Sequence, residues 1–260
     1  MSSLPPPPPS PPPPSGWAPP TSSGGWGPPP VTVQPWRSLQ GLSTALTVLL
    51  IVVAVLAAGG VGAFLHRDQV WSDGSLSELD EADDIVAGTA GLLILAGVAV
   101  FVVLVVWTYR AARNLEALGR PSPTLGAGWA IGGWFIPFAN LVLPFLVLRD
   151  VWKGGEPGVP RGDPRWKQVP VGAPLIVWWS LWVASWVAWA VLQNLDDDEF
   201  LTTTEEVRRN TAWGSVAMGL SALAAVAAIV ALRAMTRRQH AAWSAQTGVG
   251  PAGFPVPGRP

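Results

Sequence analysis

Four long apolar stretches without a charged residue constrain this chain more than any other feature of its sequence. They occupy residues 42–65, 85–107, 174–192 and 211–232. A helix needs roughly 20 apolar residues to cross a hydrocarbon core about 30 Å thick, and each stretch is close to or above that length. Within a bilayer, only helices and closed barrels satisfy all their backbone hydrogen bonds. The sequence therefore predicts an all-α fold, a polytopic transmembrane helical bundle.

A fifth uncharged stretch, residues 129–148, is long enough to span but contains two prolines. Pro137 and Pro144 each remove a backbone donor and clash with the preceding turn, and Asn140 between them offers a side chain that satisfies freed backbone groups. A broken segment persists at membrane depth only where other protein covers it. We therefore expect four full spans plus one proline-broken re-entrant or in-plane segment. The alternative is a kinked fifth span.

The distribution of basic residues distinguishes these two topologies. With five spans the termini lie on opposite sides, and the 16 Lys and Arg residues divide at best ten to six. With four spans the termini share a side, and all basic residues except Arg67, Arg208 and Arg209 fall on it. Lys and Arg are enriched in the loops that face the cytoplasm. The charge pattern thus favours four spans, with both termini cytoplasmic.

A run of aromatic and polar residues connects the second span to the broken segment. It comprises Trp107-Thr108-Tyr109-Arg110-Ala111-Ala112-Arg113-Asn114-Leu115, then Trp129, Gly133-Trp134-Phe135-Ile136-Pro137, Asn140-Leu141 and Pro144. This pattern resembles the signature of the domain of unknown function 4328 family, which consists of bacterial, mostly actinobacterial, multi-pass membrane proteins. The resemblance is strongest over residues 107–152 and extends over residues 42–238. It implies a helical membrane domain, located in a bacterial inner membrane, and no particular reaction, ligand or partner.

The two ends of the chain differ from this membrane domain. Residues 1–38 are mostly Pro, Ser and Gly, with few apolar side chains to offset a backbone ordering cost of about 1 to 2 kcal/mol per residue. We expect a disordered proline-rich cytoplasmic leader there, a helical membrane domain over residues 39–238, and a disordered Gly/Pro-rich tail over residues 239–260. Two Gly-Trp-x-Pro-Pro repeats in the leader are typical either of docking motifs for a protein partner or of a flexible tether.

One candidate site combines the broken segment with the third full span. Tryptophans of that span at positions 179, 182, 186 and 189 follow a three-four-three spacing, which places them on one helical face. Such a stripe is typical of a groove for an isoprenoid, quinone or lipid chain, and the alternative is bulky packing against neighbouring helices. The candidate lipid-binding residues are Trp134, Pro137, Asn140, Pro144, Trp182 and Trp186.

A second candidate site is a basic rim at the inner membrane face. Arg110, Arg113 and Asn114 follow the second span, and Arg149 and Lys153 follow the broken segment. Arginine binds phosphate through two parallel hydrogen bonds, so this rim predicts contact with a lipid phosphate or an acidic segment of a partner. The alternative is orientation anchoring by arginines near anionic headgroups.

Residues that carry catalysis or bind metals are scarce. The chain has no cysteine, and its two histidines, His66 and His240, follow different spans on opposite sides of the membrane. No span contains an ionisable residue, and neither a Walker loop nor an HExxH pattern occurs. We therefore expect no enzyme activity, metal site, cofactor or nucleic-acid binding. The sequence favours a non-enzymatic structural or regulatory interaction module in contact with membrane lipids; the alternative is a protein that binds or transports a lipid or small molecule.

Overall fold

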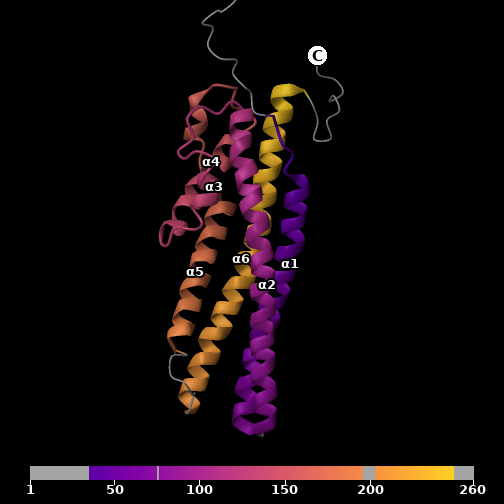
Figure 1. The fold of residues 1–260 in the computed structure, drawn as a ribbon, viewed down its shortest axis with the longest axis vertical. Helices are drawn as coiled ribbons and strands as arrows, with labels where there is room; N and C mark the ends of the chain where they lie inside the picture. Colours follow the sequence, from indigo (N-terminus) through magenta and orange to yellow (C-terminus); the bar gives the residue numbers. More distant parts are fainter. Residues whose placement is uncertain (1–34, 75, 196–202, 249–260) are drawn as a thin grey trace, which may run out of the picture. The chain divides into compact units, whose positions relative to one another are not determined.

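The computed structural model describes residues 35–74, 76–195 and 203–248. These residues belong to one unit of the chain, Gln34–Pro260, whereas the other unit, Met1–Val33, lies outside the described residues. The described part of the chain is helical and contains no strand (Figure 1). The disorder predicted for the leader before residue 35 and for the tail after residue 248 concerns residues that the structure does not describe.

Four long helices form the bundle, and each is long and apolar enough to cross a membrane. They are α1 (Gln40–Asp73), α2 (Leu76–Ala117), α5 (Ala173–Leu195) and α6 (Thr204–Thr247). At about 1.5 Å per residue, α1, α2 and α6 are longer than a hydrocarbon core of roughly 30 Å, so they continue beyond their apolar spans. The predicted all-α bundle with four spanning helices is confirmed.

The four helices pack in the order α2, α1, α6, α5. Helix α6 packs along both α1 and α5, and α2 packs mainly along α1 (Figure 1). Many of the buried residues of α6 are small, among them Gly214, Ala217, Ala224, Ala225, Ala228 and Ala231. Small side chains let helix backbones approach closely in a membrane, where packing rather than water exclusion drives association. The small residues of α6 thus allow it to pack closely against both α1 and α5. Helices α2 and α5 lie at the two ends of the packing order.

The segment 129–148 is broken, as its prolines predict. It forms α3 (Trp129–Gly132), a turn, the 3-10 helix η1 (Ala139–Leu141) and the beginning of α4 (Leu143–Gly154). Pro144 lies in the first turn of α4, where a missing N–H breaks no helical hydrogen bond. Among the described residues, the helices that qualify as spans are the four long ones, so this segment does not form a fifth span.

The turn between α3 and α4 carries apolar side chains on its surface. Phe138 is 87% exposed, and Phe135 and Val142 are more than half exposed. A large exposed apolar surface is unusual on a protein face that meets water, but it is normal against lipid. The exposed turn therefore agrees with a re-entrant or in-plane segment that contacts hydrocarbon.

The acidic stretch 67–84, between the first two apolar stretches, is mostly helical. Helix α1 continues to Asp73 and α2 begins at Leu76, so the connection is only a short turn. Arg67 of α1 forms an ion pair with Asp83 of α2, which joins the two helices beyond their apolar spans.

The predicted start of the tail at residue 239 is wrong, because α6 continues to Thr247. Gln239 is completely buried, donates a hydrogen bond to the Ala111 carbonyl at 2.9 Å, and accepts one from Asn114 at 3.3 Å. These contacts attach the last turns of α6 to α2. The helical domain therefore extends beyond its predicted end at residue 238.

The predicted end of the leader at residue 38 is also wrong, because the residues before α1 pack on the same part of α6. Trp36 stacks on Trp243 with ring centroids 5.1 Å apart, and the Leu39 N–H donates to His240 Nε2 at 3.3 Å. Burial lowers the pKa of His240, which lies beyond the apolar span of α6, and this favours the neutral ring that can accept the bond. Residues 35–39 thus form part of the folded domain.

Candidate functional site

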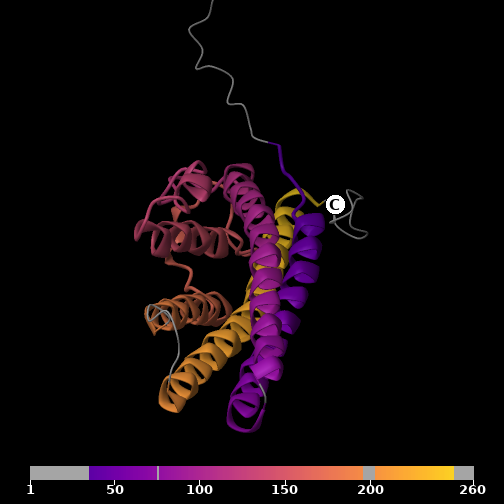
Figure 2. The same cartoon turned by 60° about the horizontal axis from the view of Figure 1, so that its bottom comes forward.

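A large apolar cavity lies between α2 and α5, and we call it the side groove. Its volume is about 700 Å³. Helices α2 and α5 supply its walls, α1 and α6 supply its floor, and the broken segment contributes Trp134 and Asn140. The ribbons of α2 and α5 are seen apart from each other in Figure 2. The groove exists because α2 and α5 each pack on another helix rather than along each other.

The side groove opens toward the outside of the bundle at membrane depth. Three of its lining residues, Ile94 and Val98 of α2 and Trp186 of α5, are also more than half exposed on the protein surface. All three belong to the apolar spans, so the surface around the opening faces hydrocarbon rather than water. A molecule dissolved in the bilayer can therefore reach the groove without crossing an aqueous phase.

An aromatic cluster joins α5 to the broken segment along the groove. The ring centroids of Trp179 and Trp182 are 4.8 Å apart, and those of Trp182 and Trp186 are 5.9 Å apart. Trp134 lies 6.0 Å from Trp182, and 5.9 Å from Phe101 on the opposite wall. The predicted tryptophan stripe therefore occupies one face of α5, and this face lines the groove.

The polar groups of the groove are few and uncharged. Among the described residues that line it, no side chain is charged. The hydroxyl of Ser221 accepts a hydrogen bond from Trp189 Nε1 at 3.2 Å, and that of Ser185 donates to the Trp182 carbonyl at 2.8 Å. The indole nitrogen of Trp134 is buried without a hydrogen-bond partner. The groove can hold an apolar chain and a small neutral polar group, but it offers no acid, base or metal ligand.

The structure brings four of the six candidate lipid-binding residues together. Trp134, Asn140, Trp182 and Trp186 all line the side groove. Pro137 and Pro144 do not line it: Pro137 is exposed in the turn, and Pro144 is buried at the beginning of α4. Both prolines shape the segment that places Trp134 and Asn140.

The opposite wall of the groove was missed by the sequence analysis. Gly97 and Phe101 of α2 line the groove, and a Cβ at Gly97 would meet no atom within 4 Å. Neither residue carries a polar or repeated signal that distinguishes it from its apolar neighbours. They are identified only by the fold, which places α2 opposite α5 on the other side of the groove.

The residues of the predicted basic rim do not form one site. The Asn114 amide is buried, donates to the Arg37 carbonyl at 2.9 Å and accepts from the Arg37 N–H at 3.1 Å. Arg113 pairs with Glu116 one turn later at 3.4 Å, and Arg110 is half-buried. Asn114 therefore has a structural role, because its amide holds the residues before α1 against α2.

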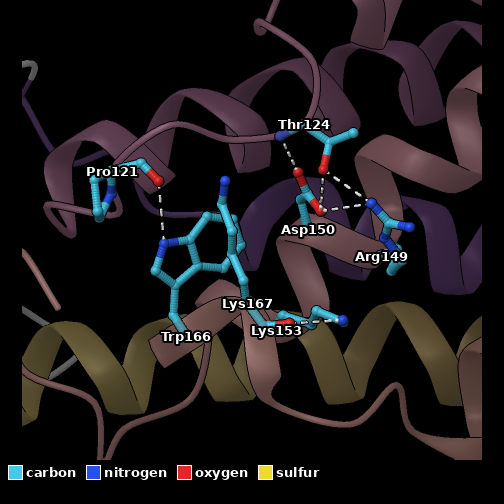
Figure 3. Close-up of polar contacts among 7 residues, drawn as sticks. All are labelled: Pro121, Thr124, Arg149, Asp150, Lys153, Trp166 and Lys167. Atoms are coloured by element: carbon cyan, nitrogen blue, oxygen red, sulfur yellow. Dashed lines mark hydrogen bonds and ion pairs between the residues drawn. The ribbon is translucent and has the colours of Figure 1, made fainter. Parts of the chain in front are cut away.

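The two basic residues of the rim on α4 hold loops in place (Figure 3). The carboxylate of Asp150 is buried and accepts a hydrogen bond from the Thr124 N–H at 2.6 Å. Arg149 donates to the Thr124 hydroxyl at 2.9 Å, and Lys153 donates to the Lys167 carbonyl at 2.9 Å (Figure 3). These contacts attach the loops on both sides of the broken segment to α4.

Comparison with known proteins assigns the chain to a family. The pattern of the family described as "Domain of unknown function (DUF4328)" matches residues 72–237, which is more than half of the chain. The chain belongs to the DUF4328 family. No curated protein and no solved structure matches it. The DUF4328 region contains α2, α5 and most of α6, and therefore both walls of the side groove.

Proposed function

We propose that this DUF4328 protein is a non-enzymatic membrane protein that binds the apolar chain of a lipid or isoprenoid in the side groove. The observation that supports this proposal is an apolar cavity of about 700 Å³ with an opening at bilayer depth. Ligand pockets typically measure about 300 to 1,000 Å³ and are lined mainly by hydrophobic and aromatic side chains. The sequence favoured an interaction module, but the groove supports the alternative of lipid binding.

The polar end of the bound molecule should be uncharged. A charged group would lose its hydration in the groove without gaining an ion pair, because none of the described side chains that line it carries a charge. Trp134 and Asn140 provide hydrogen-bonding groups at the end that the broken segment closes. A carbonyl or hydroxyl group on a long apolar chain fits this arrangement.

Replacing Gly97 by Leu should displace the bound chain. A Cβ at Gly97 has open space around it, so the new side chain projects into the groove without disturbing the helix packing. We expect the fraction of protein that retains a lipid on purification to fall about tenfold, which corresponds to a loss of about 1.4 kcal/mol in binding. Native mass spectrometry of the full chain, with identification of the released lipid, measures this fraction.

Gly91→Leu is the matched control. Gly91 lies on the same helix, a Cβ there also meets no atom within 4 Å, and the residue does not line the groove. Both substitutions replace glycine by leucine and raise helix propensity equally, by roughly 1 kcal/mol. The same lipid content in the two variants and in the wild type would contradict binding in the side groove.

We propose that the end of the bundle that carries Arg233, Arg237 and Arg238 faces the cytoplasm of a bacterial cell. We call it the arginine-rich end. The excess of basic residues there supports this orientation. The proline-rich leader then lies on the cytoplasmic side, where its repeats can contact a protein partner.

Cysteine labelling tests this orientation, because the chain has no native cysteine. Cysteines introduced at Ser122 and Gly158, in the loops before and after the broken segment, should both be protected from an impermeant reagent added to intact cells. A cysteine at Asp73, at the opposite end, should be labelled. Labelling of only one of the two loop positions would show that the segment between them crosses the membrane.

A further inference from the structure

A second cavity lies at the arginine-rich end, between the beginning of α1 and the part of α6 that follows its apolar span. It measures about 270 Å³ and is lined by Gln40, Ser43, Thr44, Arg233, Thr236 and Arg237. All six residues are polar or basic, and none is acidic. We call it the headgroup cavity. Its lining is polar and basic, whereas the lining of the side groove is apolar.

Two arginines provide the positive charge of the headgroup cavity. Arg233 and Arg237 are four residues apart on α6, so they lie on the same helical face. Neither side chain forms a hydrogen bond or an ion pair with another described residue. Arg233 directly follows the apolar span 211–232, which places the pair at the depth of lipid phosphates.

Helix α1 adds a second source of positive potential. Its N-cap residue Leu39 provides no capping side chain and its first turn has no acidic residue, so no carboxylate offsets its dipole. The Gln40 N–H is already bonded to the Ser38 hydroxyl at 3.4 Å, so the contribution of this end is the dipole. The N-terminus of a long helix carries a partial positive charge equivalent to roughly half an elementary charge. Helix N-termini of this kind favour bound phosphate groups.

Ser43 adds an uncharged hydrogen-bond donor to the headgroup cavity. Ser43 is only 6% exposed and lines the headgroup cavity, yet its hydroxyl has no hydrogen-bond partner in the described part of the chain. The oxygen itself keeps some accessible surface and Ser43 lines the cavity, so an acceptor bound there can take its hydrogen bond. Thr236 is oriented by Trp107, whose Nε1 donates to the threonine oxygen at 3.3 Å, and this leaves the hydroxyl hydrogen for an acceptor.

We propose that the headgroup cavity binds the phosphate of an anionic phospholipid. The two guanidinium groups, the helix N-terminus and the Ser43 hydroxyl all favour an oxyanion. Free inorganic phosphate shares this chemistry, but the position of Arg233 at the end of the span favours a headgroup that the bilayer itself holds there. The proposal does not depend on the side groove, which is a separate cavity lined by different residues.

The double variant Arg233→Gln with Arg237→Gln tests the proposal. Phosphatidylglycerol is titrated onto the purified full chain, and native mass spectrometry gives the affinity of the first bound lipid. We expect the affinity to fall at least about tenfold, because two charge-assisted hydrogen bonds to phosphate are lost. Ser43→Ala removes one hydroxyl and no charge, so it should lower the affinity for phosphatidylglycerol about threefold. This variant tests the proposal if the double variant does not fold.

Arg110→Gln with Arg113→Gln is the matched control, since it removes the same charge near the inner end of α2. Its affinity for phosphatidylglycerol should stay within about twofold of the wild type, because general attraction by surface charges is weaker than binding in a formed cavity. Equal losses in the two double variants would overturn the proposal. Displacement of the lipid by millimolar inorganic phosphate would assign the cavity to free phosphate and overturn the lipid assignment.

Discussion

Replacing Arg120 by Met should lower the free energy of unfolding by about 3 to 5 kcal/mol, because a buried cation and its hydrogen bonds are lost together. Arg120 is 3% exposed and donates to four backbone carbonyls at 2.8 to 2.9 Å, those of Gly154, Glu156, Val159 and Pro160. Without the guanidinium group these carbonyls lose their donor. The loop after α4 would then detach from the arginine-rich end.

Arg165→Met is the control for Arg120→Met. Arg165 is exposed and pairs with Asp163 two residues away, so its removal should leave the free energy of unfolding nearly unchanged. Denaturant unfolding of the reconstituted protein measures both values, and limited proteolysis reports whether the loop over residues 155–168 has become accessible. Equal stability of the two variants would show that Arg120 does not hold the loop.

Replacing Gly172 by Ala should destabilise the protein by about 3 kcal/mol, at the upper end of the usual cost of overpacking. Gly172 precedes α5, and a Cβ there would overlap the ring of Trp152 on α4. The ring cannot move away easily, because Trp152 is buried and the Arg238 guanidinium lies 4.7 Å from its centroid. The added methyl group must therefore push α5 away from α4.

Gly158→Ala provides the comparison for Gly172→Ala, since a Cβ at Gly158 meets no atom within 4 Å. Its effect on stability should stay within about 0.5 kcal/mol. Thermal unfolding followed by intrinsic tryptophan fluorescence separates the two variants. If Gly172→Ala melts at the same temperature as Gly158→Ala, the close approach of α5 to Trp152 is not a constraint on the fold.

The spans and the broken segment could be predicted because they depend on local chemistry. A stretch without charges must be helical to cross a bilayer, and Pro137 and Pro144 interrupt a helix wherever it lies. The predicted boundaries at residues 38 and 239 were wrong because the true boundaries depend on contacts between distant parts of the chain. Trp36 and His240 are far apart in the sequence, and long-range contacts such as theirs show that both ends of the membrane domain are ordered.

The candidate site could be predicted only in part. The spacing of Trp182 and Trp186 was visible because one helix places them on one face, and Trp134 and Asn140 were visible as polar or aromatic residues in an apolar segment. Gly97 and Phe101 could not be found, since nothing in one helix indicates which other helix lies across a gap. Ser43 and Arg233 belong to different helices and also required the fold to bring them together.

The opening between α2 and α5 affects how occupancy of the groove depends on conditions. For a lipid that enters the groove from the bilayer, occupancy of the groove depends on the mole fraction of that lipid in the membrane. The solubility of the lipid in water has no direct influence on this occupancy. Dilution of a membrane suspension would leave such a complex intact, whereas fusion with vesicles of a different lipid composition would empty or fill it. The protein would therefore respond to the make-up of the membrane in which it resides.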